Sequence, residues 1–383
     1  MIPISWKTVS LGEILEERKE KPSSQALATG AINIVSKIAF NDGKIQLRQD
    51  SETKTGMIII RPGDLVISGI NAAKGAIAIY DEKETKPIAA TIHYGAYTPN
   101  KKLVDIRYLW WLLRSNTFRD LLNQYVPGGI KTELKSKRLL PIPIPLPSLL
   151  QQRRTVDRIE YLASKTEEAR ILNDLANEEM EKLCRAIISS DKEIKPTAMN
   201  ELVRLRQPDV LVQRQETYQF AGVYCFGRGV FRGGTKTGIE FAYPRLTRLQ
   251  TGNFVYPKLM AWEGAFGVVP KECNGYVVST EFPVFEVDER RIFPEVLDTY
   301  FKSPTIWSDI AGASTGTNVR RRRLNPQDFL AYKFPLPSRA TQEKLRKIKI
   351  QIDTVRPVLD KIVVELKAIL PSILDKAFKG ELL

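Results

Sequence analysis

The sequence predicts an α+β protein of two tandem mixed α/β globules, separated by two long antiparallel helices that pair as a coiled-coil strut. A short motif of alternating prolines ending in serine occurs twice, at 144–148 and 334–338, about 190 residues apart. Each copy is followed by roughly 40 residues whose apolar side chains recur at helical spacing. The elements before each motif also follow a similar order, so the chain is predicted to be an internal pseudo-twofold repeat.

The first copy of the motif is the longer one. Prolines at alternate positions from Pro141 to Pro147 keep the backbone extended and remove amide donors, so no helix or central strand passes through. Ser148 then stands where a helix N-cap belongs. From there to about Ile188 the chain has no proline or glycine, and its apolar residues recur with a mean step close to 3.5, the period of a helix that packs lengthwise against another. These residues are Val156, Ile159, Leu162, Ala169, Leu172, Ala176, Leu183 and Ile187.

The second copy, Phe334–Ser338, precedes a similar stripe that runs from Leu345 to Ala377. Gln342 aligns with Gln152 of the first copy. Pro357 and Pro371 lie inside this second helix, where each removes an i→i−4 hydrogen bond, so a kink or a frayed turn is expected there. A repeat of this length is too long for a solenoid and indicates one duplicated unit.

These patterns divide the chain into four predicted parts. Residues 1–148 form the first globule and 149–190 the first long helix; residues 191–337 form the second globule and 338–383 the second long helix.

Basic residues are concentrated in the globules. The chain carries +14 overall, of which +7 lies in 1–148, −1 in 149–190, +4 in 191–337 and +4 in 338–383. A basic surface on two separate globules indicates a polyanion contacted twice.

Composition also limits the compartment and the chemistry. No run of 18 apolar residues occurs, and the N-terminus lacks the layout of a signal peptide. Three cysteines without CxxC spacing fit reduced thiols in the cytoplasm. The single histidine, His93, argues against a multi-histidine zinc site, and its alternating context predicts a structural residue within a strand at 88–94.

Within the first globule, a short strand turns into a helix near Leu11, and Asn41-Asp-Gly43 predicts a tight hairpin. Strands are expected at 57–60, 65–68, 76–80 and 88–94, with a loop at 69–75 that has a glycine at each end. Helices are expected at 108–113 and 117–125, with Trp110 and Trp111 in the core. A loop at 127–131 then leads into a basic run.

The second globule repeats this order. Leu202–Leu205 is predicted to replace Val9–Leu11, and a loop at 232–238 to replace the Asn41–Gly43 turn. The segment 261–267 matches the loop at 69–75, and 313–323 matches 127–138. Shared scaffolds with different loop residues are expected of two modules that read different targets.

Motifs of common catalytic sites are absent: the sequence has no Walker A motif, HExxH, GxSxG or zinc-ligand cluster. The glycines at 227–234 lack GxGxxG spacing. The sequence therefore predicts no catalytic residue, no metal site and no cofactor of its own.

Residues suited to phosphates and base edges remain. They occupy the glycine-bounded loop of each globule, the segment 228–236 and the loop that precedes each proline motif, where amides, hydroxyls and cations can contact DNA. The predicted DNA-binding residues are Asn71, Lys74, Lys131, Arg228, Arg232, Lys236, Trp262, Glu263, Thr315, Thr317, Asn318, Arg320, Arg321, Arg322 and Arg323.

With these residues in view, the chain resembles the specificity subunit of type I restriction–modification systems. The resemblance rests on the two proline motifs with Gln152 and Gln342, on the long helices after them, and on the ending Ala377-Phe-Lys-Gly-Glu-Leu382. It implies that each globule is a target recognition domain reading one half of a bipartite sequence in double-stranded DNA, while the helices set the spacer. It further implies a non-catalytic chain that recruits two modification subunits, which bind S-adenosylmethionine, and restriction subunits.

Two other functions stay open from the residues alone. One alternative is a single-chain nuclease with an unrecognised carboxylate site, which would cleave DNA with magnesium and no partner. A protein-only scaffold would not bind DNA even with partners present.

Overall fold

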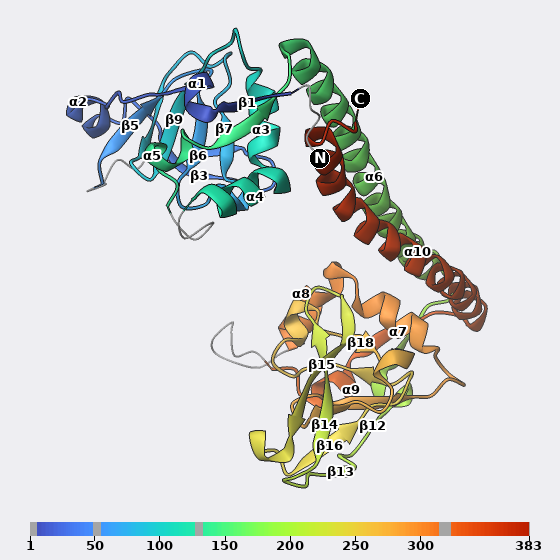
Figure 1. The fold of residues 1–383 in the computed structure, drawn as a ribbon. Coiled ribbons are helices and arrows are strands. Elements are labelled where there is room, and N and C mark those ends of the chain that lie inside the picture. The colour runs from blue at the N-terminus through green and yellow to red at the C-terminus, as the bar shows by residue number, and fades with distance from the viewer. Residues whose placement is uncertain (1–5, 49–54, 127–132, 314–322, 383) are drawn as a thin grey trace. The chain divides into compact units, whose positions relative to one another are not determined.

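The computed structural model describes residues 6–48, 55–126, 133–313 and 323–382 (Figure 1). It contains two compact units: unit 1 comprises 1–172 with 361–383, and unit 2 comprises 173–360. The division between them falls within the two longest helices, α6 (Leu149–Ser189) and α10 (Arg339–Phe378).

The described part of unit 1 contains a two-stranded and two four-stranded sheets. The first pairs β1 (Lys7–Ser10) with β10 (Pro143–Leu146). The second has the order β2 (Leu15–Glu17), β9 (Tyr94–Pro99), β6 (Leu65–Ser68), β7 (Ile77–Ile79). The third has the order β4 (Ile45–Arg48), β3 (Ile34–Ile38), β8 (Ile88–Thr91), β5 (Met57–Ile60), in which β3 and β8 run parallel. The helices are α1 (Leu11–Ile14), α2 (Ser24–Ala28), η1 (Ala72–Lys74), α3 (Ile106–Leu113), α4 (Asn116–Tyr125) and α5 (Ser136–Leu139).

Unit 2 has the corresponding sheets. The first pairs β11 (Lys195–Ala198) with β21 (Lys333–Leu336). The second has the order β12 (Val203–Leu205), β20 (Val284–Val287), β17 (Phe254–Val255), β18 (Gly267–Val268). The third has the order β13 (Val210–Leu211), β16 (Arg245–Arg248), β19 (Val277–Ser279), β14 (Thr217–Tyr224), β15 (Gly229–Thr237). The helices are η3 (Met199–Glu201), η4 (Gly238–Glu240), η5 (Ala261–Glu263), η6 (Lys271–Cys273), α7 (Pro294–Phe301), α8 (Pro304–Ala313) and α9 (Pro326–Ala331).

The duplication predicted from the sequence is confirmed by these pairings. In each unit the first strand pairs with the strand of the proline motif, and the second sheet has four strands in the same order. The third sheet contains in both units a hairpin whose first strand lies parallel to a later strand, β3 to β8 and β14 to β19. Unit 2 adds one strand, β13, at the edge.

The long helices run antiparallel, as the packing inside each unit shows. In unit 1 the start of α6 and the end of α10 share one core, in which Val156 and Ile159 pack with Ile373 and Phe378 (Figure 1). In unit 2 the end of α6 and the start of α10 share the other core, which includes Ile187 and Leu345. Each core also contains side chains of the globule, so the helix ends belong to the folded units.

Two features of the long helices refine the expectations from the sequence. Helix α10 continues through Pro357 and Pro371, so neither proline frays a turn. The apolar stripe is buried only in part, because Leu172, Leu183 and Val355 are exposed. The stripe is covered near the helix ends, where a globule packs on it.

Three local expectations for the globules are also corrected. The predicted strand 88–94 is two strands, β8 and β9, joined by a turn at Ile92 and His93. The segment 232–238 is not a loop, since it continues strand β15 as far as Thr237. By sheet order, the counterpart of Val9–Leu11 is β11 rather than Leu202–Leu205, whose strand β12 corresponds to β2.

Candidate nucleic-acid interface

In unit 1 the predicted residues Asn71 and Lys74 lie at a turn after β6. Asn71 precedes η1, and Gly75 follows it with a φ of 89°, a left-handed conformation that glycine adopts without strain. A groove beside this turn is lined by Asn71, Ser68, Phe40 and Lys37, so the turn and the β3–β4 hairpin share one surface. The Lys74 ammonium lies 5.9 Å from the centre of the Phe40 ring.

In unit 2 the same elements meet. Trp262 and Glu263 lie in η5, which follows β17 and ends at Gly264 with a φ of 75°. The turn of the β14–β15 hairpin bonds to it: the Phe226 amide donates to the Glu263 carbonyl at 2.8 Å, and the Gly227 amide to the Gly264 carbonyl at 3.0 Å. The predicted equivalence of the two glycine-bounded loops is therefore confirmed.

Arg228 belongs to this surface, whereas Arg232 and Lys236 lie farther along β15. The Arg228 guanidinium stacks 4.5 Å from the centre of the Tyr224 ring, at the hairpin turn. Arg232 Nε donates to the Glu272 carbonyl at 2.9 Å, and Lys236 lies 5.9 Å from the Phe220 ring centre. Arg228 and Lys236 are eight positions apart along the chain, about 26 Å at strand spacing. The three cations of the segment 228–236 therefore do not share one loop.

The predicted residues in the loops that precede the two proline motifs are mostly outside the described part of the chain. This holds for Lys131 in the first globule and for Thr315, Thr317, Asn318, Arg320, Arg321 and Arg322 in the second. Arg323 is described: it is exposed and forms an ion pair with Glu281.

The remaining singled-out residues are structural. Trp111 is buried, while Trp110 is half-buried and donates its indole N–H to the Ile77 carbonyl at 2.8 Å. His93 Nδ1 lies 3.0 Å from Glu133 Oε1 at the surface, so it is a turn residue with a carboxylate partner.

Two phenylalanines that the sequence did not single out, Phe40 and Phe226, lie at the tips of the two equivalent hairpins. Each tip contacts the C-cap residue of a helix. In unit 1 this residue is Arg114 at the end of α3, and in unit 2 it is Lys302 at the end of α7. Arg114 Nη2 donates to the Phe40 carbonyl at 3.0 Å, and a Cβ at Gly227 would lie 2.9 Å from the Lys302 carbonyl. An aromatic residue next to a turn signal was the only sequence clue.

Burial affects the cation that supports the first tip. The Arg114 guanidinium stacks 4.2 Å from the Trp110 ring centre, and burial lowers the pKa of Arg114 to about 10. It remains charged at neutral pH, so it holds the hairpin backbone firmly.

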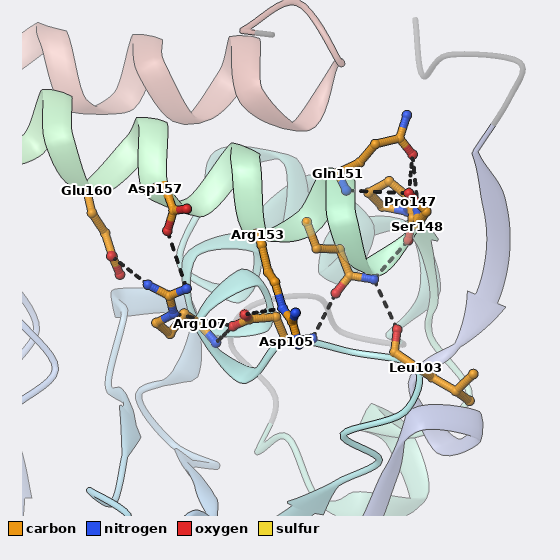
Figure 2. Close-up of polar contacts among 10 residues, drawn as sticks. Leu103, Asp105, Arg107, Pro147, Ser148, Gln151, Arg153, Asp157 and Glu160 are labelled. Carbon is orange, nitrogen blue, oxygen red and sulfur yellow. Dashed lines mark hydrogen bonds and ion pairs between the residues drawn. The ribbon is translucent and has the colours of Figure 1, made fainter.

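A buried glutamine joins each long helix to its globule in the same way. In unit 1, Gln152 Nε2 donates to the carbonyls of Pro147 at 2.8 Å and Leu103 at 3.1 Å, and its Oε1 accepts from the Asp105 amide at 2.8 Å. Figure 2 shows these partners around the start of α6. Asp105 is the N-cap of α3, so one side chain fixes the helix, the proline motif and α3 together.

Gln342 repeats this arrangement in unit 2. Its Nε2 donates to the carbonyls of Pro337 at 3.0 Å and Arg291 at 3.2 Å, and its Oε1 accepts from the amide of Phe293, the N-cap of α7, at 3.1 Å. Both glutamines are almost fully buried. The alignment of Gln152 with Gln342 in the sequence therefore reflects one shared structural role, which we call the glutamine clamp.

Each helix also begins with a serine cap, as predicted for Ser148. Its hydroxyl and amide pair with Gln151 Oε1 at 3.0 and 3.1 Å, forming a capping box (Figure 2). In unit 2 the amide and hydroxyl of Ser338 both donate to Asp191 at 2.8 Å. Hydrogen bonds from the Glu193 amide and from Ser338 lower the pKa of Asp191 to about 2. The segment after α6 is thereby tied to the start of α10.

An ion pair joins each globule to its long helix, and the positions of the cation and the anion are exchanged between the two units. In unit 1, Arg107 of α3 pairs with Glu160 and Asp157 of α6 at 2.9 and 3.4 Å (Figure 2). The equivalent residue of α7 is Glu295, which pairs with Arg346 of α10 at 3.4 Å. Each globule is therefore complementary to its own helix.

Two absences concern the part of the chain that the structure describes. Its histidine, cysteine and acidic side chains form no group that could hold a metal ion. None of its helices combines the length and the apolar character needed to cross a membrane.

Comparison with known proteins agrees with this architecture. Residues 3–177 match the family model described as "Type I restriction modification DNA specificity domain". A curated relative, the type I restriction enzyme MjaVIII specificity subunit of Methanocaldococcus jannaschii, is 25% identical over 173 residues, which cover 42% of this chain and 40% of the relative. The match thus spans well under half of that relative's length.

Solved structures extend the likeness of fold to the whole chain. A chain from work on complex assembly and conformational transition of the type I R-M system has a TM-score of 0.68 at 17% identity, covering 100% of this chain and 99% of that one. The HsdS subunit from Thermoanaerobacter tengcongensis has a TM-score of 0.50 at 18% identity, covering 99% and 98%. The first half of this chain is therefore similar to the type I restriction modification DNA specificity domain, and the whole chain, with the same topology repeated in its second half, shares its fold with these solved structures.

Proposed function

We propose that the chain is the DNA sequence-recognition subunit of a type I restriction–modification complex and reads a bipartite target in double-stranded DNA. The single observation that carries the proposal is the repetition of one surface: in each unit a hairpin tip adjoins a glycine-bounded turn with polar or charged side chains, on a globule with net positive charge. Two such surfaces in one chain suit two half-sites.

The predicted residues at this surface have chemistry suited to DNA. Asn71 and Glu263 can hydrogen-bond to base edges, whereas Lys74 and Arg228 can neutralise phosphates. The candidates outside the described residues, Arg320 to Arg322 among them, remain predictions of the same kind.

The chain recruits its catalytic partners and performs no chemistry itself. Apolar side chains left exposed on α6 and α10 offer a docking surface to two modification subunits, and restriction subunits complete the assembly. These side chains are Leu150, Tyr161, Ile171, Leu172, Leu175 and Leu183 on α6, and Ile350, Val355, Val358, Val364 and Ile369 on α10. S-adenosylmethionine belongs to the modification subunits. The three cysteines are unpaired, which suits action in the cytoplasm.

The test is a purified complex of the full chain with its modification subunits, footprinted on DNA from the host. The proposal expects two protected patches separated by an unprotected spacer. The chain alone, incubated with magnesium and the same DNA, should leave it intact. A single continuous footprint, or cleavage by the chain alone, would contradict the proposal.

A further inference from the structure

The hairpin tips carry the two exposed phenylalanines of the chain. All fifteen phenylalanines lie within the described residues, and thirteen are buried or half-buried. Phe40 is 50% exposed and Phe226 is 64% exposed. An apolar ring left in water twice, at equivalent positions of two diverged copies, needs an explanation other than packing.

Both rings are held on rigid turns. Arg114 bonds to the Phe40 carbonyl, and the Phe226 amide bonds to η5. Among the described non-glycine residues, Phe226 has a positive φ, of 61°. This conformation costs free energy, and the hydrogen bonds from the Phe226 and Gly227 amides maintain it. The tip is therefore preorganised, and its ring rests beside Trp307 with 6.2 Å between ring centres.

A cation lies on the same surface as each ring. The Lys74 ammonium lies 5.9 Å from the centre of the Phe40 ring, and Arg228, two residues after Phe226, stacks on Tyr224 at the same hairpin turn. A flat apolar ring with a cation on the same surface, on globules with net charges of +7 and +4, matches a partner that presents flat apolar faces between phosphates. DNA bases have this chemistry.

We propose that Phe40 and Phe226 are base-contacting wedges, each of which inserts into a base step of one DNA half-site and unstacks it. This inference rests on the proposed function and deepens it, because it assigns one specificity-determining side chain to each half. Apolar side chains that enter base steps unstack them in other DNA-binding proteins.

The test uses the full chain in complex with its modification subunits and a duplex carrying the motif that is methylated in the host. 2-Aminopurine, which fluoresces when unstacked, replaces each base of both half-sites in turn. The wild-type complex should increase its fluorescence at one step in each half-site. Phe226→Asn should abolish the increase in one half-site only, and Phe40→Ala in the other only. Asparagine is chosen at 226 because it tolerates a positive φ.

Binding should change in parallel. Loss of one base–aromatic contact should weaken the affinity about fivefold to a hundredfold. Phe40→Tyr and Phe226→Tyr should restore both signals, since tyrosine keeps the ring. Ile239→Ala, at an exposed apolar residue of η4 beyond the far end of β15, is the matched control and should change neither. Unfolding temperatures of all variants report whether the fold is intact.

The two possible failures differ. If the wild-type complex binds no motif duplex, the proposed function fails and the wedge proposal fails with it. If the wild type binds but both phenylalanine variants keep its affinity and fluorescence, the wedge proposal alone is wrong. Weakened binding without any unstacking signal in the wild type would also overturn insertion, because it would indicate a surface contact.

Discussion

Replacing Gln152 with alanine tests whether the glutamine clamp holds helix and globule together. The change removes three hydrogen bonds of 2.8 to 3.1 Å and leaves the carbonyls of Pro147 and Leu103 and the Asp105 amide without this partner. At about 1 kcal/mol for each bond, the free energy of unfolding of unit 1 should fall by about 3 kcal/mol. For a unit of this size that corresponds to a decrease of about 6–12 °C in its unfolding temperature.

Differential scanning calorimetry of the full chain measures this decrease. Gln151→Ala is the matched control, because this neighbouring side chain is only half-buried and bonds to Ser148 of the helix cap. Its effect should stay near about 0.5 kcal/mol, the low end for a capping contact. Gln342→Ala should produce an equal loss in unit 2. If Gln152→Ala shifted the transition no more than Gln151→Ala does, the clamp would not stabilise the helix–globule contact.

Three further predictions concern other contacts. Burial alone would raise the pKa of Asp298, but the ammonium groups of Lys302 and Lys349, 2.8 and 3.0 Å away, outweigh burial and lower this pKa. The Asp298 carboxylate therefore stabilises unit 2 above about pH 4, and this stabilisation is lost as the pH falls further. Lys349→Met should therefore lower the free energy of unfolding by about 1–3 kcal/mol at pH 7 and make it depend less steeply on pH in acid. Chemical unfolding at several pH values measures both effects, with the exposed Lys347→Met as control. Equal pH profiles for the two variants would refute the role of the Lys349–Asp298 pair. Arg228→Ala should weaken DNA binding by the complex and reduce the slope of log affinity against log salt by about 1 in fluorescence anisotropy, and an unchanged slope would exclude a phosphate contact. Leu172→Asp on the exposed face of α6 should reduce co-purification of the modification subunits with the chain. The unfolding temperature should change no more than for an ordinary surface substitution. Full recovery of the complex would place the docking surface elsewhere.

The sequence predicts the duplication and the long helices well because both depend on local chemistry. Alternating prolines permit only extended backbone, and Ser148 and Gln151 form a capping box whichever globule precedes them. Gln152 and Gln342 were found as a repeated position. Two of the three partners of each glutamine come from loops about 50 residues earlier in the chain, so the clamp itself was visible only in the fold.

The errors have tertiary causes. Gly233 and Gly234 indicated a loop, yet they form a bulge in β15 opposite Phe220 of β14, where a Cβ at Gly233 would lie 2.8 Å from the Phe220 carbonyl. Glycine is there to allow a close backbone approach within a strand rather than to form a turn. The exposed tip residues Phe40 and Phe226 were also missed for a tertiary reason. Whether an aromatic side chain is exposed depends on the fold, and no periodic pattern in the sequence indicates it.

Methylome sequencing of a host that carries this chain with its modification subunits tests the central claim most directly. Two equivalent readers in one chain predict methylation within a motif of two defined halves separated by a spacer of fixed length and free sequence. A continuous motif, or a methylome that does not change when the chain is deleted, would contradict it.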